Sequence, residues 1–245
     1  MATPASNWPT LLHVTHAKSG SQWLRAILDN CAPHQVVHPV HGMGQFLENP
    51  VRSGMIYPAL FVTKDEFDGV VLPPNARRFV VIRDLRDTLV SWYFSLKVSH
   101  TVDHSTLTEM RNTLNALTFE KGLIWLIEDP YFSKIATIQS SWCQSGELLV
   151  RYEDLLERDE EILERILLHE CGIPVERARL REIIHANRFD QLTGRTRGTE
   201  DVSSHQRKGI AGDWCNHFTH RVKDSFKERF GTVLIETGYE STDSW

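Results

Sequence analysis

Residues 15 to 23 read THAKSGSQW, and they lie between an apolar run, LLHV at 11–14, and a helix-like run, WLRAIL at 23–28. A loop that leads from a strand into a helix presents the unpaired N–H groups of the first helical turn, and the helix dipole adds partial positive charge there. Gly20 permits a close backbone approach, Ser19 and Ser21 add hydroxyl donors, and Lys18 adds a full positive charge. The segment predicts an anion site that suits a phosphate.

This loop departs from the nucleotide-triphosphatase pattern GxxxxGK[ST], because its lysine precedes the glycine and no GK[ST] occurs. The departure argues against a kinase or a GTPase. A Ser/Gly loop that only caps a helix, with its lysine in solvent, is the structural alternative.

A second cationic position follows the apolar run FVVI at 79–82, which is typical of a buried parallel strand. Arg83 stands at the carboxyl end of this run, where open α/β sheets bind their ligands. Asp87 and Ser91 follow on the next helix, and an Arg83–Asp87 ion pair is the structural alternative. Two later segments add polar groups, LLVRYED at 148–154 and RKGIAGDW at 207–214.

In this order the segments resemble the PAPS-dependent sulfotransferases, which use 3′-phosphoadenosine-5′-phosphosulfate (PAPS). The family loop YPKSGTTWL is similar to HAKSGSQWL at 16–24, and a family arginine with a serine eight positions on corresponds to Arg83 and Ser91. The family's YED matches residues 152–154, and its RKGxxGDWKNHFT matches RKGIAGDWCNHFT at 207–219, with Cys215 in place of lysine. The resemblance extends from about residue 11 to residue 219.

The resemblance implies a role for each matching residue. Lys18 neutralises the bridging oxygen of the leaving group, and Ser91 restrains that lysine until the acceptor arrives. The 5′-phosphate lies against Ser19, Gly20, Ser21 and Gln22, and the 3′-phosphate against Arg83, Ser91, Arg207, Lys208 and Gly209. Trp23 and Phe189 sandwich the adenine, unless they are core residues, and Tyr152 bonds its edge. PAPS is then the co-substrate, 3′-phosphoadenosine-5′-phosphate (PAP) is a product, and no metal is expected.

The general base is the open question in the sequence. Cytosolic members of the family carry a histidine in a KTHLP segment, where this chain reads VTKDEFD at 62–68, with Asp65 nearest. Other branches place a glutamate about twenty residues after the loop lysine, where this chain offers His38 and His41. A histidine titrates close to neutral pH and suits proton abstraction. His41 and Asp65 are the leading candidates, with His38 and His16 as further ones.

Composition limits the class of protein. A net charge of −5 over 245 residues disfavours nucleic-acid binding. Four scattered cysteines fit free thiols in a reducing compartment. The N-terminal segment has no signal-peptide pattern, and no apolar run is long enough to span a bilayer. We expect a cytoplasmic protein without a membrane partner.

The apolar runs at 11–14, 59–62, 79–82 and 148–150 alternate with helical patterns at about 21–30, 86–98, 106–127, 132–142, 155–171 and 176–187. This alternation predicts an α/β fold of one domain, residues 1–245, with a central parallel sheet flanked by helices on both faces and a P-loop-like phosphate-binding loop. The polar stretch at about 193–213 is expected to be a flexible lid, which in the family folds over the cofactor.

Two expectations concern partners, and two alternatives concern the function. A pocket rim of mixed aromatic and polar residues (Met43, Phe46, Tyr57, Phe67, Tyr93, Phe94 and His100) favours a small-molecule acceptor with a hydroxyl or amine group over a long anionic polysaccharide. The family's dimer segment KxxxTVxxxE corresponds to CNHFTHRVKD at 215–224, where His220 replaces valine, so a monomer or a weak homodimer is expected. A non-catalytic adenine-nucleotide sensor and a P-loop kinase-like phosphotransferase are the alternative functions.

Overall fold

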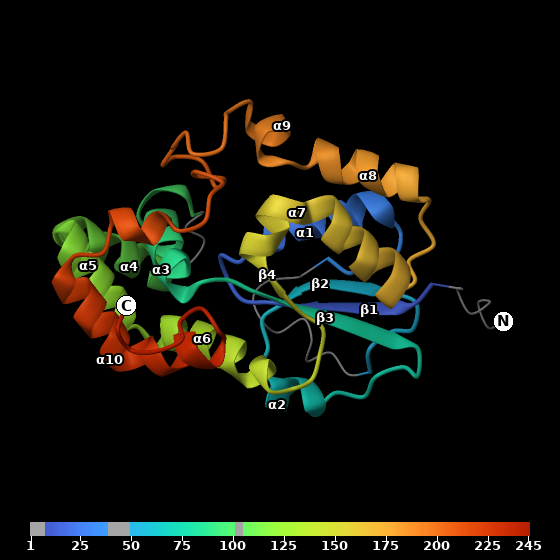
Figure 1. The fold of residues 1–245 in the computed structure, drawn as a ribbon, viewed down its shortest axis with the longest axis horizontal. Helices are drawn as coiled ribbons and strands as arrows, with labels where there is room; N and C mark the ends of the chain where they lie inside the picture. Colours follow the sequence, from blue (N-terminus) through green and yellow to red (C-terminus); the bar gives the residue numbers. More distant parts are fainter. Residues whose placement is uncertain (1–7, 39–49, 101–104) are drawn as a thin grey trace.

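The computed structural model describes residues 8–38, 50–100 and 105–245 of the chain. The four strands within these ranges run parallel in the order β2-β1-β3-β4. Figure 1 shows α1, α7 and α8 on one face of this sheet and α2 and α6 on the other. The expected α/β fold, a parallel sheet covered on both faces, is confirmed.

Strands and helices alternate along the described residues, and η marks π- or 3₁₀-helices. The strands are β1 (Thr10–Val14), β2 (Ile56–Leu60), β3 (Ala76–Ile82) and β4 (Leu149–Arg151). The helices are α1 (Ser21–Cys31), α2 (Lys64–Asp68), α3 (Leu85–Phe94), η2 (Ser95–Ser99), α4 (Ser105–Ala116), α5 (Phe119–Ile127), α6 (Pro130–Cys143), α7 (Tyr152–Glu164), η3 (Arg165–Glu170), α8 (Arg177–Ala186), α9 (Phe189–Thr193), η4 (Asp213–Asn216) and α10 (His220–Glu236).

The sheet is buried on both faces because successive strand residues point in opposite directions. Leu11 and Val81 pack beneath α1, α7 and α8, whereas their neighbours Leu12 and Val80 pack against α2 and α6. A third apolar cluster joins α3, α5, α6 and α10 beside the sheet. Continuous apolar runs such as FVVI are the sequence pattern that such two-sided burial produces.

Several predicted boundaries were wrong. The strand expected at 59–62 is β2, which begins at Ile56 because the backbone there pairs with that of Leu11 in β1. Ala59 has a φ of 58°, and the register between β1 and β2 shifts there. The single helix expected at 106–127 is divided into α4 and α5, since Thr118 caps α5 by accepting from the N–H of Lys121. The helices α2, α9 and α10 were not predicted.

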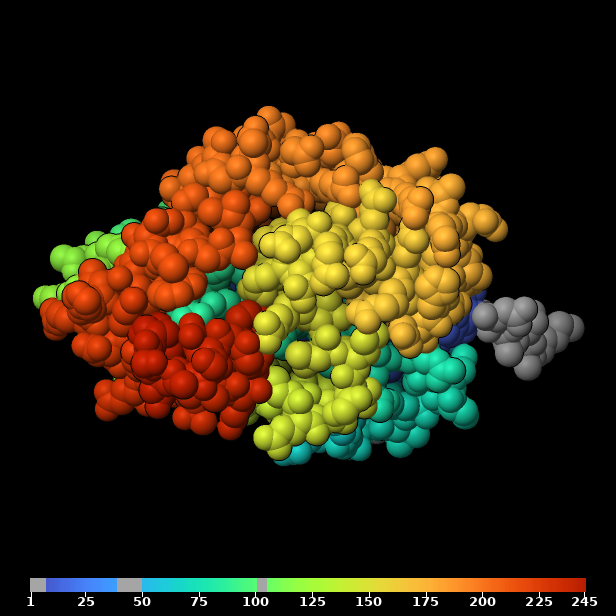
Figure 2. Space-filling view, viewed as in Figure 1, coloured from blue at the N-terminus to red at the C-terminus, as the bar shows by residue number. Residues whose placement is uncertain are grey.

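The lid segment, residues 193–213, contains no helix or strand between α9 and η4. Arg195 nevertheless donates to the carbonyls of Thr199, Gln206 and Arg207, and Arg197 donates to the carbonyl of Leu156 in α7. In Figure 2 this segment and α9 form an orange band that reaches from α8 to the helices around α10. The lid therefore has a defined path across the top of the molecule, and its movement stays a prediction.

Two helical glycines provide a matched test of the packing beside the sheet. A Cβ at Gly122 in α5 would lie 2.7 Å from the ring of Tyr93, which is buried, whereas the nearest atom to a Cβ at Gly231 in α10 is 3.4 Å away. We expect Gly122→Ala to lower the free energy of unfolding by about 1–3 kcal/mol, because overpacking forces Tyr93 to move. Gly231→Ala should be neutral or stabilising by up to about 1 kcal/mol through helix propensity. Urea unfolding measures both changes, and equal effects of the two substitutions would refute the packing argument.

Candidate active site

The loop after β1 is braced from inside by side-chain hydrogen bonds. The Ser19 hydroxyl is buried, donates to the carbonyl of His16 at 2.6 Å and shares a short hydrogen bond with Thr15. Thr15 in turn donates to the carbonyl of Val81 in β3 at 2.8 Å. The Ser19 side chain therefore stabilises the loop, and only its backbone N–H is open to a ligand.

The backbone of this loop is shaped to accept an anion. Lys18 and Gly20 have positive φ angles of 69° and 85°, and Gly20 is the N-cap of α1 without a side-chain capping bond. Within the described ranges, the N–H groups of residues 18–22 donate to no acceptor. Open N–H groups at the start of a helix bind anions, since they meet the positive end of its dipole.

Lys18 is half-buried beside this loop, and its ammonium has no hydrogen-bond or ion-pair partner among the residues that the structure describes. Burial first, and then the positive charges of Arg83 and Arg207, lower the pKa of Lys18 to about 8. The free energy of this repelled cation falls when an anion binds next to it. Lys18 is thus poised to bind a negatively charged group.

Arg83 connects the loop to the lid segment. Its guanidinium donates to the carbonyl of Lys18 at 2.8 Å and to that of Ile210 at 3.4 Å, and it lies 4.6 Å from the ring centre of Tyr152. Burial opposes its charge, but Tyr152 and nearby carboxylates, Asp87 among them, raise the pKa of Arg83 above its ordinary value. Its Nε–H is buried without a partner in the described part of the chain.

Asp87 fastens the end of the lid segment to α3. Its buried carboxylate accepts from the N–H groups of Gly212 at 2.7 Å and Trp214 at 2.9 Å. The nearest guanidinium nitrogen of Arg83 is 3.8 Å away, so the expected Arg83–Asp87 pair is secondary to these backbone bonds. Burial raises the pKa of Asp87 above its ordinary value. The charge of Arg83 and the hydrogen bonds from the two N–H groups lower it in part.

The cations of the late motif are paired within the protein. Asp213 is buried and accepts from Arg207 at 2.5 Å and from Lys208 at 2.6 Å. Glu200 forms a further short ion pair with Arg207, whose guanidinium also lies 4.5 Å from the ring centre of Phe94. Although burial opposes its charge, these donors hold the pKa of Asp213 well below its usual range. The sequence reasoning missed this acid, which the motif RKGIAGDW contains.

The predicted adenine residues lie against glycines. A Cβ at Gly20 would be 2.8 Å from the ring of Tyr152, and one at Gly209 would be 2.5 Å from the ring of Phe189. Trp23 meets Tyr152 edge to face, with ring centres 6.4 Å apart. The structure brings Trp23 and Tyr152 together beside the loop and places Phe189 against the lid segment.

The remaining cofactor candidates differ in exposure. Ser21 is buried at the start of α1, and Gln22 beside it is exposed. Ser91 is half-buried on α3, and its hydroxyl has no hydrogen-bond partner in the described ranges.

The candidate bases are scattered. His16 is fully buried with both ring nitrogens bonded, to Ala17 and to Gln139, and burial lowers its pKa to about 4, so it is part of the core. Asp65 is exposed on α2, and exposed His38 contacts Arg25. His41 lies outside the described residues. The sequence reasoning missed His205, a lid residue whose pKa is lowered first by the charge of Lys18.

The predicted acceptor rim is only partly at the surface. Tyr57, Phe67 and Tyr93 are core residues with exposures of 5%, 2% and 1%, so the prediction was wrong for these three. Phe94 and His100 are half-buried near the lid segment, and Met43 and Phe46 lie outside the described residues.

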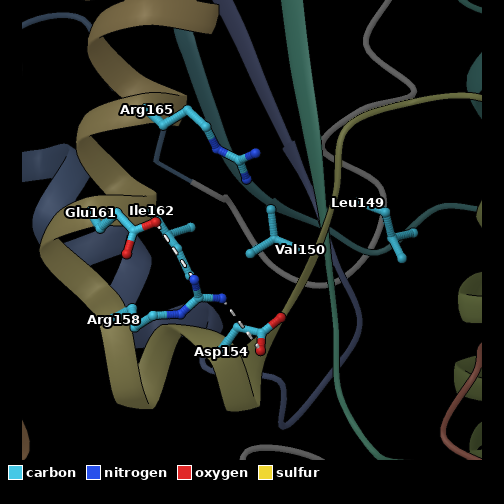
Figure 3. A pocket seen from close by; sticks show the side chains of 7 residues that line it. All are labelled: Leu149, Val150, Asp154, Arg158, Glu161, Ile162 and Arg165. Atoms are coloured by element: carbon cyan, nitrogen blue, oxygen red, sulfur yellow. Dashed lines mark ion pairs between the residues drawn. The ribbon is translucent and has the colours of Figure 1, made fainter.

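A separate hollow of about 150 Å³ lies between β4 and α7 (Figure 3). Val150 points into it, and Arg158 pairs there with Asp154 and Glu161 at the kink of α7. Neither the residues after β1 nor the lid segment lines this hollow, so it does not belong to the candidate site.

The sequence pattern of the sulfotransferase domain family matches residues 9–238. The chain therefore belongs to the sulfotransferase family. Human sulfotransferase 1C2 is 25% identical over 251 residues, which cover 89% of this chain and 80% of that protein. Guinea pig (Cavia porcellus) sulfotransferase 1E1 is 30% identical over 171 residues, 64% of this chain and 54% of that protein.

Solved structures share the fold at low identity. Mouse sulfotransferase SULT7A1 complexed with PAP has a TM-score of 0.62 at 18% identity, with 92% of this chain and 84% of that one covered. Retinol dehydratase with androsterone and PAP has a TM-score of 0.53 at 13% identity, with coverage of 92% and 80%. Among the described residues, no helix is long and apolar enough to cross a membrane, and no cluster of His, Cys, Asp and Glu could hold a metal ion.

The repulsion around Lys18 can be measured directly. We expect its amine to titrate at about 8 in the ligand-free protein. Arg207→Gln removes one repelling charge and should move this pKa upward, toward the ordinary 10.5. The pH dependence of acetic anhydride labelling at Lys18, followed by mass spectrometry, reports the pKa. Arg179→Gln on α8 is the matched control and should change nothing; an unchanged profile in Arg207→Gln would contradict the electrostatic arrangement.

Proposed function

We propose that this protein transfers the sulfuryl group of PAPS to a hydroxyl or amine of a small-molecule acceptor and releases PAP. The observation that carries the proposal is that, among the described residues, the ammonium of Lys18 and the N–H groups of residues 18–22 beside it have no partner. Family membership supports the reaction class, since the chain matches the sulfotransferase domain over residues 9–238.

The residues present fit a ligand that carries two phosphate groups. The loop and Lys18 would hold the 5′-phosphate end. The buried Nε–H of Arg83, which has no partner in the described part of the chain, gives a donor for the 3′-phosphate. Arg207 and Lys208 would join Arg83 there after exchanging part of their pairing with Asp213 for the phosphate. PAPS supplies an activated sulfuryl group; Lys18 stabilises the charge that builds on the leaving oxygen, as preorganised cations do in phosphoryl transfer.

The same reasoning separates this function from its alternatives. A P-loop phosphotransferase needs magnesium carboxylates and a GK[ST] loop, and the chain has no GK[ST] sequence. A non-catalytic sensor would keep the nucleotide site and lack a base near Lys18. Sulfuryl turnover with a panel of phenols separates the enzyme from the sensor.

A small acceptor agrees with the structures of similar fold, in which retinol dehydratase is complexed with androsterone or with retinol. A monomer or a weak homodimer agrees with Thr219, whose hydroxyl caps α10 and donates to Glu120 at 2.6 Å within the same chain. The cytoplasmic location remains a prediction.

Nucleotide binding tests the proposed co-substrate. We expect PAP to bind at least about 100-fold more tightly than 5′-AMP, because charge-assisted bonds to the extra phosphate contribute roughly 1.5–3 kcal/mol each. Arg207→Gln should remove much of this preference, and Arg179→Gln should leave it intact. Calorimetry with PAP, AMP and Mg-ATP makes the comparison. Equal affinities for PAP and AMP, or tighter binding of Mg-ATP, would exclude the proposed function.

Acceptor class is tested by a screen with radiolabelled PAPS against phenols, aliphatic alcohols, amines and sulfated-glycan precursors. We expect labelled product from small phenols, alcohols or amines only, since a protein of similar fold is complexed with androsterone and with retinol. His41→Ala and Asp65→Ala belong in the same screen as tests of those candidate bases. Labelling restricted to oligosaccharides would contradict the small-molecule assignment.

A further inference from the structure

The carboxylate of Asp213 is shared between the two cations of the RKG sequence and two side chains next to it. Its Oδ2 accepts from Arg207 at 2.5 Å and from the Nε2–H of His217 at 3.1 Å. Its Oδ1 accepts from Lys208 at 2.6 Å and from the amide of Asn216 at 3.0 Å. Each carboxylate oxygen therefore has one cationic partner and one local partner.

The backbone of Asp213 is held in place on both sides. The N–H groups of its neighbours Gly212 and Trp214 both donate to the carboxylate of Asp87, at 2.7 Å and 2.9 Å. The side chain of Asp213 is short and only 3% exposed, so its carboxylate has little freedom to move. Its two cationic partners have long side chains, whose rotations can carry the charged ends to another anion while the acid stays where it is.

The local partners keep Asp213 bonded even without its cations. A buried carboxylate that loses every donor is costly, because no water replaces the lost hydrogen bonds. Asn216 and His217 would still donate one hydrogen bond to each oxygen. The ring of His217 lies against those of Phe94 and Phe119, with ring centres 5.6 Å and 5.4 Å away, which keeps this donor in position. The cations can therefore leave Asp213 without orphaning it.

Arg207 has a second carboxylate partner in the lid segment. One terminal nitrogen of its guanidinium bonds to Asp213, and the other forms a short ion pair with Glu200. Glu200 is more exposed than Asp213, so water weakens its hold on the guanidinium. The two cations that a 3′-phosphate would need are thus already bonded to carboxylates of the protein.

We propose that Asp213 is an internal competitor of the 3′-phosphate, a role that rests on the proposed sulfuryl transfer. A nucleotide with a 3′-phosphate has to take Arg207 and Lys208 from this carboxylate, whereas a nucleotide without one leaves the pairs intact. The competition weakens the binding of PAPS and PAP and does not weaken that of 5′-AMP. Because PAP stays on the protein after transfer, Asp213 accelerates product release. It is a positioning residue that acts through its two cations.

Nucleotide affinity tests the competition by its sign. Asp213→Asn keeps the size of the side chain and removes its charge. We expect this variant to lower the Kd of PAP by about tenfold, since charge-assisted bonds to the acid no longer have to be exchanged, and that of 5′-AMP by less than about twofold. Glu200→Gln should lower the Kd of PAP by about threefold. Glu164→Gln on α7, which loses the partner of Arg181 there, is the matched control and should change neither Kd.

Calorimetry measures these affinities, and urea unfolding shows that each variant is folded. A merely structural role of Asp213 predicts weaker binding of PAP, which is the opposite sign. Unchanged or weaker binding of PAP by folded Asp213→Asn would overturn the proposal, and so would an equal gain for PAP and 5′-AMP. If Asp213→Asn does not fold, Glu200→Gln decides the question by the same criteria, because its carboxylate is at the surface.

The release of PAP gives a second test, which needs no acceptor. Surface plasmon resonance with immobilised protein measures the dissociation rate constant of PAP. We expect Asp213→Asn to lower this rate constant by about tenfold, because affinity differences within one site lie mostly in dissociation. An unchanged or faster release would overturn the role of Asp213 alone. Failure of the wild-type protein to bind PAP would instead remove the proposed function, and the role of Asp213 with it.

Discussion

The carboxylate of Asp87 is the interaction on which the site depends. It accepts from the N–H groups of Gly212 at 2.7 Å and Trp214 at 2.9 Å, and thereby ties the end of the lid segment to the start of α3. Hydrogen bonds to a charged acceptor contribute about 1.5–3 kcal/mol each. Arg83 directly precedes α3, at the carboxyl end of β3. The same bonds therefore bring Arg207 and Lys208 of the lid segment to the carboxyl ends of β1 and β3, where parallel sheets bind ligands.

Bringing the cations of the site close together costs free energy because they repel one another. Some of them are stabilised by partners within the protein, and one is not. Arg207 is paired with Asp213 and Glu200, and Lys208 with Asp213. Arg83 is stabilised by two carbonyls, the ring of Tyr152 and nearby carboxylates. Lys18 alone is left without a partner in the described residues, and its pKa is lowered accordingly. A phosphate of the ligand would relieve the repulsion at Lys18. The strongest driving force for binding is therefore located at Lys18, the residue that would stabilise the charge on the leaving oxygen.

The sequence predicted the sheet, the phosphate loop and the cations, since these depend on local patterns such as FVVI and AKSG. The prediction failed for side chains whose orientation or burial depends on contacts with residues distant in the sequence. Ser19 turns inward because Thr15 and the carbonyl of His16 lie behind it, and Tyr93 is buried by packing against α5.

A crystal structure of the complex with PAP tests the central claim most directly. We expect the 5′-phosphate on the N–H groups of residues 18–22 and the Lys18 ammonium, and the 3′-phosphate between Arg83 and Arg207, with Asp87 still bonded to Gly212. A nucleotide bound elsewhere, or one whose 3′-phosphate faces solvent while Arg207 remains paired with Asp213 and Glu200, would contradict it.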